Sequence, residues 1–226
     1  MRKALFILLI TTSAFAGSRR CGFSIDTSTS VDPTARRAAL SRIAEGLPDL
    51  VTDLHCTTIS VASFTDQGWF TPVAYYDLPP DEHAPCHTNA TTAQRVLAPF
   101  ASYQAAAREQ CAAQRALEDQ RNTVARALAL RRVTHALEAV RTTRSRCTDI
   151  TTHLALLAHL RRSDDVDFVL TDAQQTCIVN GVVPLARMTF ILLPGGGRAP
   201  DVTHRFPGTT GLVPADLSAP RWWVAP

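Results

Sequence analysis

The chain has 226 residues, 46% of them apolar, which predicts one globular domain with a full hydrophobic core and no second independent domain. Its formal net charge of +3 includes Arg2 and Lys3, so the chain after them is near +1. Lys3 is the only lysine beside 22 arginines, which indicates a bias toward Ala and Arg codons. We therefore do not expect the protein to bind nucleic acid.

The first residues follow the three-part pattern of a secretory signal peptide. A basic start at Arg2 and Lys3 precedes the apolar run 4–10, and Ala14-Phe15-Ala16 ends the segment. The run is too short for a membrane anchor, which needs about 18 apolar residues. We expect cleavage after Ala16, a single mature domain over 17–226, no stable membrane span, and a periplasmic or secreted protein of a bacterium.

Cysteine usage agrees with export. The mature chain holds an even number of widely spaced cysteines and no CxxC motif, a pattern that predicts disulfides in an oxidising compartment. Six cysteines allow 15 pairings, and the sequence does not select one. The disulfide candidates are Cys21, Cys56, Cys86, Cys111, Cys147 and Cys177.

The first half of the chain predicts alternating strands and helices. A short apolar stretch over 21–25 ends at Asp26, and a helix capped by Asp32 is expected to stop at Gly46-Leu47-Pro48. Two strands follow, in 56–66 and in 71–80. We then predict a helical insertion over about 80–146, folded as a hairpin with its turn at 118–123, because one helix from Tyr103 to Val140 would be about 57 Å long.

The second half predicts a helix over 150–160, a strand in 165–173 that ends at Asp172, and a last strand in 186–197. The tail, about 195–226, is rich in Pro and Gly, and we expect it to be irregular. Strands that alternate with helices imply an α/β fold, with an open, mostly parallel, Rossmann-like sheet covered on both faces. Such sheets bind ligands at the carboxyl ends of their strands.

Carboxylates and hydroxyls gather at that edge of the predicted sheet. Asp26 and Asp172 each end a strand, Ser28 and Ser30 follow Asp26 on alternate residues, and Thr148 precedes a helix. Oxygen ligands without thiolate or imidazole suit Mg²⁺ or Mn²⁺ better than zinc. The other interpretation is that these hydroxyls only cap helices and satisfy backbone groups.

These residues resemble the von Willebrand factor A-type (VWA) domains, the fold shared with integrin inserted domains. "DTSTS" at 26–30 matches the family's DxSxS motif, "CTDITTHLALLAHL" is similar to its threonine-plus-helix segment, and "DFVLTDA" is similar to its strand ending in Thr-Asp-Gly. The resemblance implies a metal-ion-dependent adhesion site at Asp26, Ser28, Ser30, Thr148 and Asp172, completed by a carboxylate from a protein partner. Ala173 departs from the family's glycine, and the tail is shorter than the family's last strand and helix.

The sequence suggests three possible functions. We expect a non-catalytic protein that binds a protein partner through Mg²⁺ or Mn²⁺. An alternative is a structural or scaffold protein of the envelope that acts through the helical insertion and keeps a vestigial metal site. A metal-dependent hydrolase using Asp26 and Asp172 is disfavoured, because the sequence offers no evident general base or nucleophile beside the metal.

Two further segments bear on function. In "DEHAPCH" (81–87), His83 and His87 suggest zinc, but Pro85 forbids the helix that would align them, so we do not expect a zinc site. The pair Trp222 and Trp223 is either a plug folded back on the core or an exposed contact.

Overall fold

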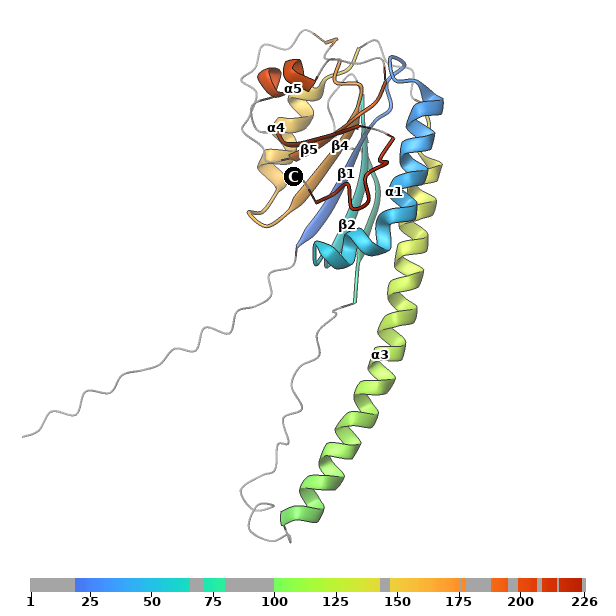
Figure 1. Ribbon diagram of the computed structural model, residues 1–226, viewed down its shortest axis with the longest axis vertical. Coiled ribbons are helices and arrows are strands. Elements are labelled where there is room, and N and C mark those ends of the chain that lie inside the picture. The colour runs from blue at the N-terminus through green and yellow to red at the C-terminus, as the bar shows by residue number, and fades with distance from the viewer. Residues whose placement is uncertain are drawn as a thin grey trace, which may run out of the picture.

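A computed structural model describes residues 19–65, 71–79, 100–142, 147–174, 176–177, 188–194, 199–206, 209–214 and 216–224 (Figure 1). The expected signal peptide, the segment "DEHAPCH" and Cys86 lie outside these ranges.

A six-stranded sheet forms the centre of the molecule, with the order β3-β2-β1-β4-β5-β6. All neighbouring strands are parallel except β2 and β3, which are antiparallel and place β3 at one edge. The predicted fold class, an open and mostly parallel Rossmann-like sheet, is confirmed. The strands are β1 (Arg20–Asp26), β2 (Thr58–Phe64), β3 (Thr71–Asp77), β4 (Val166–Thr171), β5 (Met188–Leu192) and β6 (Thr209–Pro214).

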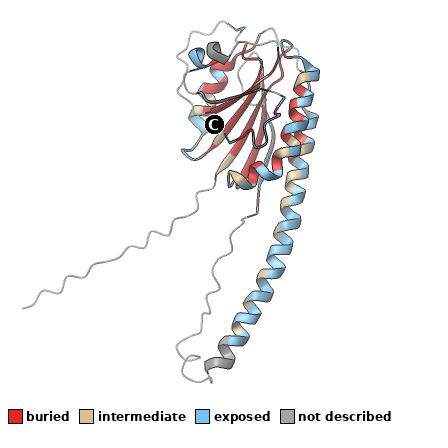
Figure 2. Ribbon diagram, in the orientation of Figure 1, coloured by how far each residue is buried: buried red, intermediate tan, exposed pale blue. Residues whose placement is uncertain are grey.

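Helices cover both faces of the sheet (Figures 1 and 2). Successive strand residues point to opposite faces, so Phe168 and Leu170 join one core cluster while Val169 joins the other. The first cluster lies under α1 (Pro33–Asp53) and α3 (Phe100–Ala139), and the second under α4 (Ile150–Leu160) and α5 (Ala199–Arg205). The central strands are thus buried on both faces, as a parallel sheet requires.

The predicted start of α1 is confirmed and its predicted end is wrong. Asp32 caps the helix by accepting a hydrogen bond from the Thr34 amide, and Pro33 occupies the first turn. The helix continues through Pro48 to Asp53. A proline inside a helix costs about 3 kcal/mol, but Leu50 and Val51 beyond it are fully buried, and each contributes about 1.5–3 kcal/mol.

The described part of the insertion, 100–142, holds one long helix, so the predicted hairpin with a turn at 118–123 is wrong. Helix α3 runs unbroken for 40 residues, about 60 Å at 1.5 Å per residue. The segment "EDQRNT" contains no Gly or Pro to end a helix. A helix longer than the domain is possible here because only one end of α3 packs on the sheet, while the other projects beyond it (Figures 1 and 2).

The prediction of an irregular tail is also wrong. Residues 199–205 form α5, and 209–214 form β6, which pairs with β5. Trp222 and Trp223 are buried and belong to the first core cluster, so they are a plug and not an exposed contact. The indole nitrogen of Trp223 donates to Asp53, which fastens the end of the chain to α1.

Candidate functional site

The sheet brings the two strand-end aspartates to one edge. Strands β1 and β4 are adjacent and parallel, and Ile25 pairs with Leu170 in their register. Asp26 therefore lies at the same level as Thr171, with Asp172 one residue further along. Both carboxylates are fully buried at the carboxyl ends of the strands, the edge at which open α/β sheets bind ligands.

Hydrogen bonds fix the Asp26 carboxylate from two sides. Its Oδ1 accepts from the Ser28 amide at 2.9 Å, and its Oδ2 accepts from the Thr171 hydroxyl at 2.7 Å. Burial raises the pKa of Asp26 above its ordinary value of 3.8; the bonds from Ser28 and Thr171 lower it, and the charge of Asp172 raises it further. Asp26 and Asp172 are thus close enough for their charges to interact.

The loop after β1 presents its two serine hydroxyls together. The hydroxyl groups of Ser28 and Ser30 are joined by a hydrogen bond of 2.9 Å, with Ser28 buried and Ser30 exposed. Thr29 between them is also exposed. Alternation along this loop therefore places both serines on one side, and Ser30 lies open to solvent.

A disulfide and three hydrogen bonds hold Thr148 beside the segment that follows Asp172. Cys147 and Cys177 are joined, and the amides of Thr176 and Cys177 both donate to the Thr148 carbonyl at 3.1 Å. The Thr148 amide donates to the Thr176 hydroxyl at 2.7 Å. The Asp149 amide donates to the Thr65 carbonyl, which ties the start of α4 to the end of β2.

Two buried oxygens at this edge have no hydrogen-bond partner among the residues that the structure describes. They are Thr148 Oγ1 and Asp172 Oδ2, whereas Asp172 Oδ1 accepts from the Gln174 amide at 3.0 Å. A buried polar atom left without a partner costs about 1–3 kcal/mol. Both atoms belong to the metal-binding set that the sequence predicts, and both are oxygens of the type that binds a hard cation.

The predicted metal ligands are mostly hydroxyls, with few carboxylates. Among the residues that the structure describes, no three His, Cys, Asp or Glu side chains gather as a metal cluster. The candidate set instead combines two carboxylates, Asp26 and Asp172, with the hydroxyls of Ser28, Ser30 and Thr148. Hard cations such as Mg²⁺ and Mn²⁺ accept such oxygen ligands and complete their shells with water or an external group.

Two residues that support the site, Thr171 and Arg36, are not among those predicted from the sequence. Thr171 donates to Asp26 and accepts from the Ala173 amide at 3.0 Å, so it fixes the strand end. Arg36, which is 3% exposed, donates to the Asp26 carbonyl at 3.3 Å. Arg36 precedes Ala39, Leu40 and Ile43 on the buried face of α1, and this charge on an apolar stripe was the available signal.

Histidines do not contribute to the candidate set. His153 is buried on α4 and stacks on Phe64 with 4.1 Å between ring centroids. His83 and His87 lie outside the described residues.

Comparisons with known proteins give a distant likeness in fold. No family model matches the chain, and no curated protein matches it. Two solved structures of proximal thread matrix protein 1 from the mussel byssus are similar to it. One is 9% identical with a TM-score of 0.49, covering 87% of this chain and 43% of that one. The other is 14% identical with a TM-score of 0.44, covering 86% and 41%.

The chain therefore spans less than half the length of these neighbours, which bear on neither its family nor its function. The cysteines bear on the compartment in which the protein resides. The disulfides Cys21–Cys56 and Cys147–Cys177 are formed, and no described cysteine is free, which is typical of an oxidising compartment. None of the described helices is both long and apolar enough to cross a membrane.

Proposed function

We propose that the protein binds Mg²⁺ or Mn²⁺ at Asp26, Ser28, Ser30, Thr148 and Asp172, and through the metal an acidic group of a protein partner, without catalysis. The observation that carries this proposal is a pair of buried oxygens, Thr148 Oγ1 and Asp172 Oδ2, that bond to nothing in the described part of the chain. Capping explains hydroxyls that bond to backbone amides. It does not explain a buried hydroxyl oxygen and a buried carboxylate oxygen left free at one sheet edge.

The spacing of the serine hydroxyls supports the same proposal. Adjacent ligands of an octahedral Mg²⁺ ion at 2.0–2.1 Å from the metal are about 2.9 Å apart. The Ser28 and Ser30 oxygens are separated by 2.9 Å. The loop thus holds two hydroxyls at the separation that two neighbouring positions of the ion require.

Asp26 contributes chiefly by position and charge, because both of its oxygens already accept hydrogen bonds. A cation bound by neutral hydroxyls retains most of its charge. An external carboxylate therefore binds strongly at a coordination position of the metal that the protein leaves unfilled. Ser30 is exposed, which gives a partner access to that position. The VWA resemblance implies the same arrangement, and an exported protein of the periplasm or the extracellular space meets partners there.

Titration of Mg²⁺ and Mn²⁺ into the protein by calorimetry tests the metal site. We expect Ser28→Ala with Ser30→Ala to weaken binding at least tenfold, because both direct hydroxyl ligands are lost. Thr29→Ala is the matched control, since it removes an exposed hydroxyl of the same loop that is not in the proposed set. Equal affinities in all three proteins, or no binding in the parent protein, would contradict the proposal.

A second candidate function rests on the outer part of α3. Leu117, Val124 and Leu128 are 57%, 56% and 52% exposed, and their spacing of seven and four residues aligns them along one side of the helix. Such a stripe supports the scaffold alternative, in which α3 binds the partner. Leu117→Lys with Leu128→Lys then abolishes binding to an identified partner while Mg²⁺ affinity is unchanged. Under the metal proposal, the serine variants abolish partner binding and the lysine variants do not.

A further inference from the structure

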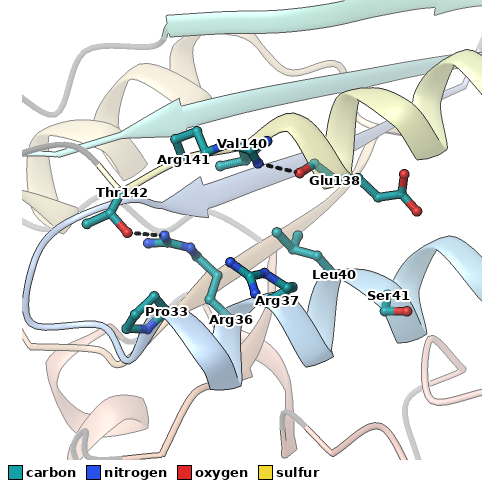
Figure 3. A pocket seen from close by; sticks show the side chains of 9 residues that line it. All are labelled: Pro33, Arg36, Arg37, Leu40, Ser41, Glu138, Val140, Arg141 and Thr142. Atoms are coloured by element: carbon teal, nitrogen blue, oxygen red, sulfur yellow. Dashed lines mark hydrogen bonds between the residues drawn. The ribbon is translucent and has the colours of Figure 1, made fainter.

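A pocket of about 380 Å³ lies between the start of α1 and the end of α3, beside the candidate metal site (Figure 3). Its charged lining residues are Arg36 and Arg37 from α1, Glu138 from α3, and Arg141 just after α3. Thr142 closes one end through a hydrogen bond from Arg36. Three arginines and one glutamate give these walls a net positive charge.

Arg36 is a buried cation that has no anionic partner at contact distance within the described ranges. Its guanidinium donates to two neutral oxygens, the Asp26 carbonyl and the Thr142 hydroxyl. It forms no ion pair with any residue that the structure describes. Burial lowers the pKa of Arg36 from its ordinary value, and the charge of Asp26 offsets only part of that effect. A buried charge of this kind is costly unless an anion compensates it.

The other charged groups leave the pocket open to an anion. Arg37 and Arg141 are both exposed at the pocket, and Arg141 donates to the Glu138 carbonyl at 2.8 Å, which holds it at the end of α3. In Figure 3 the Glu138 carboxylate lies at the opposite end from the Arg36 guanidinium. Glu138 therefore does not neutralise Arg36, and the other charged residues of the lining, Arg37 and Arg141, are both cationic.

We propose that this pocket is a second binding site, which takes an oxyanion group, a phosphate or a carboxylate, between Arg36, Arg37 and Arg141. The planar guanidinium fork suits both groups, because it donates two parallel hydrogen bonds to a pair of oxygens. The site does not include any residue of the proposed metal set. Arg36 touches both sites, since it lines the pocket and bonds to the Asp26 main chain.

Calorimetric titration with inorganic phosphate and with succinate tests the proposal, on protein first freed of divalent cations by a chelating resin and kept in a zwitterionic buffer without EDTA, which is itself a polycarboxylate. We expect at least one of the two probes to bind with 1:1 stoichiometry. Binding of phosphate alone assigns a phosphate group, binding of succinate alone assigns a carboxylate, and either result supports the site. Absence of binding by both overturns it.

Variants locate the site and separate it from general surface charge. Arg37→Gln with Arg141→Gln removes two exposed cations of the pocket and leaves the buried Arg36 in place, so the fold is retained. We expect at least tenfold weaker binding of the probe, while Mg²⁺ affinity measured without the probe stays that of the parent protein. The control Arg42→Gln removes an exposed arginine of α1 that lies outside the pocket and pairs with Glu45. A loss with Arg42→Gln equal to that of the double variant would overturn the proposal.

Discussion

Asp26 shows at the scale of one residue how a buried carboxylate of the candidate metal site costs stability. The carboxylate is fully buried at the end of β1, and burial raises its pKa in the folded protein despite its hydrogen bonds to Ser28 and Thr171. Between pH 3.8 and the raised pKa, the folded state binds more protons than the unfolded state. The free energy of unfolding therefore falls as the pH rises through this window and stays lower above it. Under the proposed function, a cation bound beside Asp26 would offset this cost.

The variant Asp26→Asn separates the stability cost of the buried carboxylate from its proposed role in Mg²⁺ binding. In EDTA at neutral pH we expect the variant to be more stable than the parent protein, by about 1.4 kcal/mol for each unit by which the pKa is raised. Saturating Mg²⁺ should stabilise the parent protein by about 2.7 kcal/mol at a hundred times the dissociation constant, and the variant not at all. Urea denaturation as a function of pH, with and without Mg²⁺, measures both effects.

Two comparisons make the result specific. Asp32→Asn changes an exposed carboxylate of the same loop to an equally good helix cap, so it should alter neither stability nor the Mg²⁺ effect. Asp167 also has a pKa raised by burial, but it is present in all three proteins, so the difference between their curves isolates Asp26. A less stable Asp26→Asn variant in EDTA would mean that the carboxylate is favourable without a metal.

The candidate residues were accessible from sequence to different degrees. Asp26, Ser28 and Asp172 were found because strand ends of a parallel sheet meet at one edge, and their side chains carry the chemistry. Arg36 was missed, because its role depends on packing between α1 and residues after α3, which are more than 100 positions apart. The apolar stripe of α1 marks Arg36 as unusual, but no local pattern reports its contact with Thr142.

At the scale of elements, the two described disulfides fasten opposite ends of the sheet. Cys21 and Cys56 lie at the start of β1 and just before β2. Cys147 and Cys177 join the start of α4 to the segment after β4, beside Thr148. Their sequence separations, 35 and 30 residues, are similar. The two disulfides therefore reduce the entropy of the unfolded chain by similar amounts. They differ in the segments that they hold together in the folded protein.

Removing each disulfide tests whether Cys147–Cys177 serves the site. Loop-closure entropy predicts that either double Cys→Ala variant loses about 3–4 kcal/mol of stability. Only Cys147→Ala with Cys177→Ala should also weaken Mg²⁺ binding, because Thr148 and the segment after Asp172 are then no longer held together. Denaturation and calorimetry on both variants check this. Equal Mg²⁺ affinities in the two variants would show that hydrogen bonds alone position Thr148.

Element types followed from the sequence more readily than element ends. The strands around Phe23, Val61 and Phe168 were predicted because they are short apolar runs between helical patterns. The end of α1 was misplaced, because Pro48 is a local signal whose cost is outweighed by burial of Leu50 under tertiary packing. β6 was missed because its pairing with β5 is not encoded in a strongly apolar run.

At the scale of the whole molecule, α3 divides into a packed part and a projecting part. Its buried side chains among the described residues are Val133, Ala136 and Leu137, close to its end. The contacts of α3 run to α1, β3 and β2. Figure 2 shows the projecting part exposed on most of its surface. A length limit derived from the size of a compact domain does not apply to a helix that leaves the domain, which is why the hairpin was predicted in error.

This division predicts opposite outcomes for the same substitution in the two parts of α3. Proline inside a helix removes a hydrogen bond, clashes with the preceding turn and costs about 3 kcal/mol or more. At the buried Ala136 the damage reaches the core, so we expect Ala136→Pro to lower the free energy of global unfolding by at least that amount. At the exposed Ala116 the loss stays local, and the cooperative transition should change by less than about 1 kcal/mol. Urea denaturation followed by tryptophan fluorescence reports the global transition, because Trp222 and Trp223 lie in the core. An equal loss in both variants would show that α3 folds as one cooperative unit with the sheet along its whole length.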